Sequence, residues 1–251
     1  MNIERILNFR TIIILIFAAL LSYGIYWLVI SNIFKNNLLL QLAENKSISY
    51  KTIDSSGFPT QIQTNINEFE IINSKSDDIL LESKAIQLSI HPFDLSKVAL
   101  KSNLISILVN KDNLVFDIDM NSVLSIMFVD QNNLHNLNSA VNNIKISGND
   151  IFLANLDQVH IKINENSPQL FDINTKINSA QLETINSQNV SIEMKGTLKL
   201  DNKVLNGNLN ILIKDLKTNE DIFNLPFNIK DNQVIFLFMN IFDLNKILFF
   251  L

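Results

Sequence analysis

Side chains that commonly do chemistry are scarce in this sequence, and histidine is the first case. Its three histidines are His91, His135 and His160. His91 precedes a proline, which indicates a turn, and His160 falls on the polar side of an alternating segment. His135 lies in an asparagine-rich stretch with no acidic or serine partner at motif spacing. None belongs to an H-E-x-x-H pattern or a comparable set of zinc ligands, so the histidines predict no metal site.

Paired carboxylates are the second possibility. Asp117 and Asp119, in the segment FDIDM, would share one face of a strand, as a catalytic acid and base can. A solvated strand face flanked by turns is the simpler interpretation. The sequence contains no glycine-rich phosphate loop, no G-x-S-x-G nucleophile elbow and no cysteine. We therefore expect a protein that is not an enzyme and that needs no metal or cofactor.

The N-terminal segment predicts a membrane anchor. Both arginines, Arg5 and Arg10, precede the uncharged run TIIILIFAALLSYGIYWLVI at 11–30. A helix of this length rises about 30 Å, the thickness of a bilayer's hydrocarbon core. Positive charge before the run places residues 1–10 in the cytoplasm and everything after residue 30 outside. A cleaved signal peptide is the alternative, but the run is longer than such peptides need and no small-residue cleavage site follows.

Two periodicities follow the predicted span. Apolar residues at helical spacing in 31–46 predict that the helix continues outward as an amphipathic segment. From residue 47 the period becomes two, most clearly in NVSIEMKGTLKL at 189–200, which is typical of antiparallel strands with one apolar face. We expect 47–251 to form one curved antiparallel sheet of about nine to eleven strands, an open groove or half-barrel. Turns are expected at 111–113, 147–150, 200–204 and 230–233, with a loop or short helix at 130–140.

The segment SGFPT at 56–60 predicts a structural corner. Gly57 can adopt a positive φ, Pro59 fixes its own φ and donates no hydrogen bond, and Phe58 is held extended with its ring free to turn inward. In the strand that follows, TQIQTNINEFEII, the apolar positions change parity between Ile66 and Phe69. A β-bulge near 67–68 would explain this change and would bend the sheet.

This order of motifs resembles an alphaproteobacterial family known as domain of unknown function 2125 (DUF2125). Its members are single-pass proteins that face the periplasm and carry Gly-(Phe/Tyr)-Pro at the place of residues 57–59, although Thr60 departs from the family's Arg-like residue. The segment AIQLSIHPFDLSKV at 85–98 and the strands around Gly196 and Gly207 resemble later family blocks. The plan is also similar to that of AsmA-like envelope proteins, which hold lipid in an anchored β-groove. The resemblance implies an inner-membrane protein with a periplasmic domain at 47–251.

Charge and hydropathy limit the partners. The part of the chain after residue 30 has 18 Lys against 24 Asp and Glu, a net charge of −6, which argues against binding to nucleic acid or to an anionic membrane surface. The last 18 residues, VIFLFMNIFDLNKILFFL, are apolar on both strand faces. Asp243 and Lys246 would be costly inside a bilayer, so we expect a terminal strand with an apolar tail rather than a second membrane span.

The predicted sheet has an apolar face that must be covered by something. The first hypothesis is that lipid, a phospholipid or another envelope lipid, covers it in an open groove. The second is an adaptor in an envelope protein complex, with the face closed internally as a sandwich, and an envelope enzyme ranks third. Groove candidates, which ordinary core residues would also resemble, are Val159, Ile161, Ile163, Val190, Ile192 and Met194. An open apolar channel would favour lipid, whereas two facing sheets would favour the adaptor.

Overall fold

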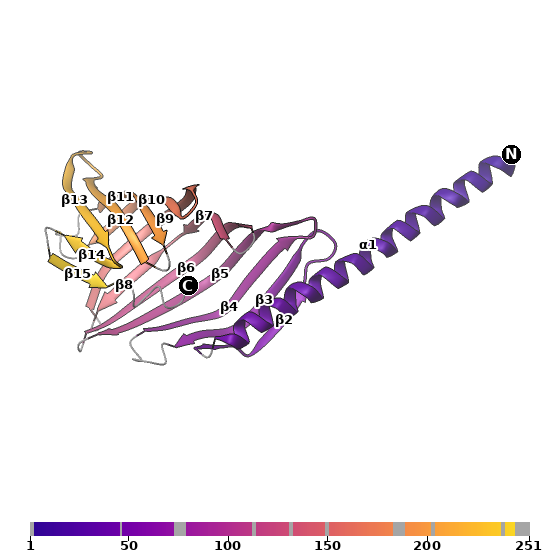
Figure 1. The fold of residues 1–251 in the computed structure, drawn as a ribbon, viewed down its shortest axis with the longest axis horizontal. Helices are drawn as coiled ribbons and strands as arrows, with labels where there is room; N and C mark the ends of the chain where they lie inside the picture. Colours follow the sequence, from indigo (N-terminus) through magenta and orange to yellow (C-terminus); the bar gives the residue numbers. More distant parts are fainter. Residues whose placement is uncertain are drawn as a thin grey trace.

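The protein consists of one long helix followed by one antiparallel sheet (Figure 1). The computed structural model describes residues 3–45, 47–72, 79–111, 114–130, 133–148, 151–182, 189–201, 204–236 and 239–243. Within these ranges all fifteen strands belong to the same sheet. The predicted mainly β class, with an N-terminal helix and a curved antiparallel sheet, is confirmed.

Helix α1 runs without interruption over Ile3–Glu44. Its 42 residues correspond to a rod of about 63 Å, and its N-terminal half projects away from the sheet (Figure 1). Residues 11–22 are exposed on every side, whereas Trp27 and Leu42 are buried against the sheet. The helix is long and apolar enough to cross a membrane, a criterion that a signal sequence also meets.

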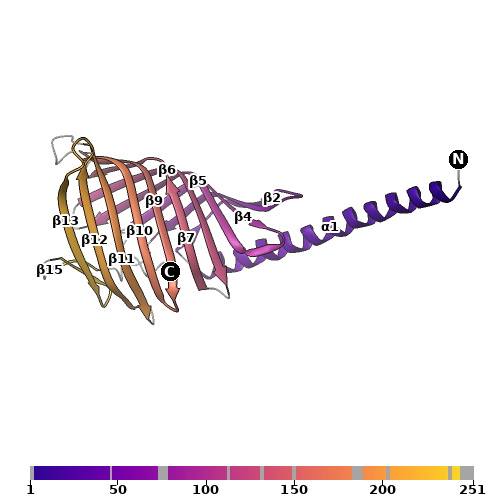
Figure 2. The ribbon, with the colours of Figure 1, turned by 90° about the horizontal axis from the view of Figure 1, so that it is seen from above.

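The strands follow each other as a meander in which neighbours along the chain pair side by side. The bounds are β1 Ile48–Ser49, β2 Thr52–Ser56, β3 Ile62–Ile72, β4 Ile79–His91, β5 Asp94–Lys111, β6 Leu114–Asp130, β7 Asn133–Val141, β8 Ile144–Gly148, β9 Ile151–Ser167, β10 Leu170–Leu182, β11 Asn189–Asp201, β12 Val204–Asp215, β13 Asp221–Lys230, β14 Gln233–Phe236 and β15 Met239–Asp243. Strands β1 and β2 both pair with β3, and β7 and β8 share one position between β6 and β9. The sheet curls strongly but is open, since no ladder joins β1 to β15 (Figure 2).

The sequence misled us about part of this sheet. The loop or short helix expected at 130–140 is wrong, because Asn133–Val141 forms β7. Leu137, Ser139 and Val141 alternate inward there, and a serine in the middle position hides the period. The strand number exceeds the expected range because short segments such as β1, β14 and β15 pair as well, and because one strand position is divided between β7 and β8.

The predicted turns fall between strands. At 230–233 the turn is confirmed, with Asp231 and Asn232 at φ 51° and 64° joining β13 to β14. Such left-handed pairs match the twist of a two-residue hairpin. The central residues of the other three predicted turns, 112–113, 149–150 and 202–203, lie outside the described residues, as do 237–238 and 244–251 of the apolar C-terminal segment.

A line of interrupted pleating, which we call the crease, crosses the sheet from β3 to β10. Along each of these strands two inward-facing residues lie three positions apart instead of two. The pairs are Ile66 and Phe69, Ser83 and Ile86, Ser102 and Ile105, Met120 and Val123, Val141 and Ile144, Leu156 and Val159, and Ile177 and Ala180. Residues with left-handed backbone lie on the line in three of the strands, β3, β6 and β9, namely Glu68, Ser122 and Gln158 at φ 49°, 50° and 51°. Because neighbouring strands are interrupted together, the whole sheet bends along one line.

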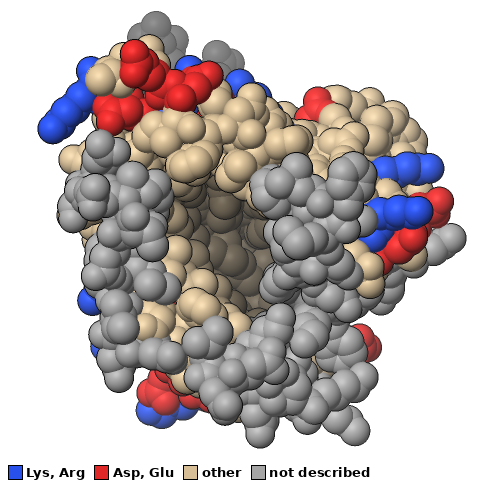
Figure 3. Space-filling view, turned by 90° about the vertical axis from the view of Figure 1, so that its left-hand side faces the viewer, with Lys and Arg blue, Asp and Glu red and all other residues tan. Residues whose placement is uncertain are grey.

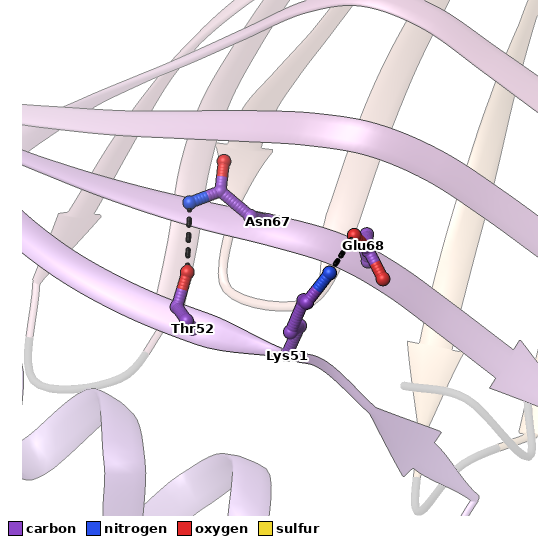
Figure 4. A network of polar contacts seen from close by, with 4 residues as sticks. All are labelled: Lys51, Thr52, Asn67 and Glu68. Carbon is purple, nitrogen blue, oxygen red and sulfur yellow. Dashed lines mark hydrogen bonds and ion pairs between the residues drawn. The ribbon is translucent and has the colours of Figure 1, made fainter.

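The parity change predicted near 67–68 is therefore confirmed, but its nature differs from a bulge in one strand. Asn67 pairs with Ala85 and Phe69 pairs with Ser83, so β4 skips a residue together with β3 and the register is kept. At the end of the crease, between β10 and β11, the register does shift, because Ile177 pairs with Ile192 and Ala180 pairs with Val190. At Glu68 the side chain turns outward, where its Oε1 lies 2.6 Å from Lys51 Nζ, beside a bond from Asn67 Nδ2 to Thr52 Oγ1 (Figure 4).

Candidate functional site

The candidate site is the concave side of the sheet, which we call the inner face. The pairing register places side chains of this face in three rows that cross ten strand positions from β3 to β13. The first row is Ile62, Ile90, Val98, Met127, Leu137, Ile163, Ile173, Gly196, Leu209 and Phe227. The second is Thr64, Leu88, Leu100, Ser125, Ser139, Ile161, Thr175, Met194, Ile211 and Leu225. The third is Ile66, Ile86, Ser102, Val123, Val141, Val159, Ile177, Ile192, Ile213 and Phe223. None of the three rows contains a charged residue.

The six predicted groove residues come together on this face. Five of them fall in the rows above, and Val190 lies on the same side of β11, next to the crease. Val159 and Val190 are 3% and 0% exposed, so these two are core residues beneath any ligand. Ile161 and Met194 are half-buried and lie on either side of Thr175 in the second row. Ile163 in the first row and Ile192 in the third row are half-buried too. The half-buried residues are the ones that a ligand could touch.

The inner face forms a hollow rather than a closed core. Figure 3 looks into it from the end of the molecule that carries β13, and the visible wall is free of lysine, arginine, aspartate and glutamate. In this view the charged side chains lie on the outer surface instead. Lys162 and Lys195 are exposed and alternate with the inward residues of β9 and β11. Along the described strands one sheet supplies the whole wall, and no second sheet faces it. The closed sandwich of the second hypothesis is therefore not observed.

Helix α1 covers one end of the inner face. Trp27, Ile30 and Phe34 pack on Ile62 and Ile90, and further along the helix Leu42 packs on residues of β2, β3 and β4. A cavity of about 510 Å³ remains between the helix and the inner face of β4, β5 and β6. It is lined by Ile30, Ile33, Phe34, Asn37, Leu38, Gln41, Leu88, Ile90, Leu95, Val98, Met127 and Val129. Ten of these twelve residues are apolar, and the volume is in the range of about 300–1,000 Å³ that is typical of ligand pockets.

Hydroxyl groups interrupt the apolar surface at defined places. Ser125 Oγ and Ser139 Oγ lie 2.6 Å apart in the second row and satisfy each other. Thr64 and Thr175, in the same row, have buried hydroxyl oxygens without a hydrogen-bond partner. Sequence reasoning missed these residues, since a hydroxyl at an inward position looks like a break in the alternation.

The residues considered for chemistry do not assemble into a reactive site. His91 and His160 are exposed, and Asp117 and Asp119 lie on the outer face, where Ser106 Oγ donates to Asp119 Oδ1 at 2.6 Å. His135 does find an acidic partner in Glu165, thirty positions away on β9. The Gln169 N–H donates to Glu165 and, with His135, holds the pKa of this carboxyl below its usual value of 4.5. Among the described residues no group of three histidine or acidic side chains is placed to bind a metal ion.

The predicted corner also has a definite place. Gly57, Phe58 and Pro59 join β2 to β3, with Gly57 at φ 98° and a cis bond before Pro59. A side chain at Gly57 would come within 2.6 Å of the Gln61 carbonyl oxygen. The ring of Phe58 does not turn into the sheet core. It is 56% exposed and packs edge-on against Trp27 of α1, with 5.5 Å between the ring centroids.

These features define a mainly β protein with one N-terminal apolar helix and an open, uncharged inner face. Comparison with protein-family models, with curated proteins and with solved structures found no match. The resemblance to domain of unknown function 2125 and to AsmA-like proteins therefore stays a prediction from the motifs of the sequence.

Proposed function

We propose that this chain is a single-pass protein of a bacterial inner membrane that binds the acyl chains of an envelope lipid on the inner face of its periplasmic sheet. The observation that carries the proposal is the set of three uncharged rows, which end in a hollow along β9–β13. A surface of this kind is unstable in water unless something apolar covers it.

Acyl chains suit this surface for an energetic reason. Each CH₂ group that leaves water contributes about 0.8 kcal/mol, so a chain can bind without specific polar contacts. Such a site needs neither a catalytic group nor a metal, in keeping with the outward position of Asp117 and the exposure of His160. The adaptor hypothesis has less support, because its closed pair of sheets is not observed.

A pair of neighbouring residues on β11 tests the proposal. Met194 faces inward and is half-buried, whereas Lys195 faces outward and is exposed. We expect the full-length protein, extracted in mild detergent, to carry phospholipid in native mass spectrometry. Met194→Glu should remove most of this lipid because a carboxylate on the inner face must be desolvated when a chain binds. Lys195→Glu adds the same group on the outer side and should leave the lipid in place.

A second variant separates loss of lipid from loss of folding. Met194→Trp adds bulk without charge, so it should reduce lipid while circular dichroism of the sheet is unchanged. Equal amounts of lipid in the wild type and both Met194 variants would contradict the proposal, as would a wild-type protein that carries no lipid.

A further inference from the structure

Two loops at one end of the sheet contact α1, and we call these two loops the tip. They are residues 57–61, between β2 and β3, and residues 91–95, between β4 and the start of β5. Tyr23 donates its hydroxyl to the Pro59 carbonyl oxygen, and Tyr26 donates to the Pro92 carbonyl oxygen at 2.7 Å. Trp27 Nε1 donates to the Gln61 carbonyl oxygen at 3.2 Å. The tip is thus fixed to the helix by three hydrogen bonds from aromatic side chains.

Ring stacking reinforces this attachment. Phe93 stacks on Tyr26 with 5.6 Å between centroids and an interplanar angle of 8°, and it also contacts Tyr23 at 5.7 Å. Phe58 contacts Tyr23 as well, with 6.1 Å between the ring centroids. In spite of these contacts the tip presents large apolar side chains to its surroundings, since Phe58, Phe93 and Leu95 are 56%, 69% and 54% exposed.

The position of the tip along the helix conflicts with a tip that stays in water. The apolar run at 11–30 is just long enough to cross a hydrocarbon core of about 30 Å. Its later part, from Tyr23 to Trp27, already lies against the tip. If the tip stayed in water, only residues 11–22 would remain for the bilayer, and these span about 18 Å. The helix is long enough for the bilayer when the tip itself enters the interfacial layer, because the helix residues beside the tip then lie in the membrane too.

The backbone of the tip is suited to that layer. Pro59 and Pro92 have no N–H group to satisfy, and their carbonyl groups accept the two tyrosine hydroxyls. Asp94 limits how deeply the tip can enter the bilayer. Its carboxylate accepts hydrogen bonds from Ser96 Oγ at 2.6 Å and from Ser96 N–H at 3.3 Å, and a charge held in this way belongs among headgroups rather than among acyl chains.

We infer that the tip is a membrane-seating surface, inserted into the headgroup layer of the same bilayer that holds α1. Aromatic rings favour this layer, where one end of the ring is apolar and the other is wet. The inference rests on the proposed membrane anchoring. Leu95 belongs both to the tip and to the lining of the 510 Å³ cavity, so seating the tip would place one end of that cavity at the membrane surface.

Single cysteines can test this inference cleanly because the chain has none of its own. Full-length Phe93→Cys and Leu95→Cys report on the tip, Phe17→Cys reports on the exposed part of α1, and Asn219→Cys reports on an exposed turn outside the tip. Each variant is labelled with the environment-sensitive dye NBD and reconstituted in vesicles of phosphatidylethanolamine and phosphatidylglycerol. Iodide is added before the vesicles are sealed, so that both protein orientations are sampled.

We expect the labels at positions 93 and 95 to emit at shorter wavelength than the label at 219 and to be quenched less by iodide. Emission and quenching at 93 and 95 equal to those at 219, with position 17 shielded, would overturn the inference and leave the anchor intact. If position 17 were also quenched like position 219, the anchoring itself would fail, and the inference with it. Quenching of Trp27, the single tryptophan, by lipids brominated near the headgroup gives a label-free check in the unmodified protein.

Discussion

Thr175 shows at the scale of one residue how the inner face differs from an ordinary core. Its side chain is 9% exposed, and it lies between Ile161 and Met194 with an unbonded hydroxyl. A buried hydroxyl without a partner costs about 1–3 kcal/mol in folded proteins. A core optimised only for stability would carry valine at this position.

Thr175→Val should therefore stabilise the protein. The substitution keeps the shape of the side chain and removes the unsatisfied hydroxyl, so we expect the free energy of unfolding to rise by about 1 kcal/mol. Urea unfolding of the full-length protein in detergent, followed by circular dichroism, measures the change. Ser139→Ala is the matched control, because it breaks the bond with Ser125 and should lower stability. A loss of stability in Thr175→Val would show that the hydroxyl has a partner after all.

Asp215 supplies a test of electrostatics at the turn after β12. Its Oδ1 accepts the N–H groups of Thr218 and Lys217, at 2.9 and 2.7 Å, and these bonds hold its pKa below the usual 3.8. A lowered carboxyl pKa means that the ionised form stabilises the folded state above the unfolded pKa, and that this contribution is lost as the pH falls through the folded value.

Asp215→Asn should accordingly destabilise the protein at neutral pH and make little difference in acid. Urea midpoints of wild type and variant would differ most above about pH 5 and would converge below the usual pKa of the carboxyl. A difference that is constant with pH, or that grows in acid, would contradict this assignment.

Individual residues were predicted with mixed success, for identifiable reasons. Alternation placed Ile161 and Met194 on the correct face because the side-chain period of a strand is a property of the backbone alone. Alternation alone does not give the degree of burial. Val190, next to the crease, is fully buried, whereas Met194, further from it, is half-buried. The pairing of His135 with Glu165 depends on a register between distant strands, and no local spacing encodes it.

The crease is the main feature at the scale of elements. Where the pleat is interrupted, backbone carbonyl groups lose their ladder partners, and buried serines replace them. Between β4 and β5 the hydroxyl oxygens of Ser83 and Ser102 lie 2.9 Å apart, and each lies within 3.3 Å of the Ala85 and Leu104 carbonyl oxygens. The two hydroxyl protons are thus shared between these two carbonyl groups. The sheet can therefore bend here without leaving buried polar groups unsatisfied.

Ser102→Ala should expose this dependence. Loss of the hydroxyl leaves Ser83 Oγ as the remaining side-chain donor for both carbonyl oxygens. Since one hydroxyl carries one proton, we expect a loss of about 1 kcal/mol in the free energy of unfolding. Ser55→Ala, at an exposed position of β2, should change stability little. Urea unfolding measures both variants, and equal stability of Ser102→Ala and wild type would contradict this dependence.

The elements themselves were predictable where a single period ran unbroken. The helix and the long strands such as β11 follow from hydropathy, and the parity change at Glu68 announced the crease in one strand. The same interruption was not visible in β4 and β5, because there it is carried by the serines Ser83 and Ser102. Serine at an inward position appears in the sequence only as a loss of alternation.

At the scale of the whole molecule, the proposed anchor and the proposed membrane-seating tip lie at one end of the sheet, and the uncharged inner face extends away from them. Helix α1 covers the inner face of the first strands and leaves the later ones, β9–β13, without a helix over them. The open sheet favours the first of the two leading hypotheses. The sequence could not separate them, since an open groove and a sandwich share the same alternation. The central claim is that acyl chains occupy the inner face.

Photo-crosslinking in intact cells measures that claim most directly. A benzoylphenylalanine introduced at Ile161 or Met194 lies on the inner face, and the same probe at Lys162 or Lys195 lies on the outer face of the same strands. After irradiation, intact-mass measurement should show adducts with the mass of a phospholipid at 161 and 194 and none at 162 and 195. Protein adducts at the inward positions, or equal lipid adducts on both faces, would contradict the account.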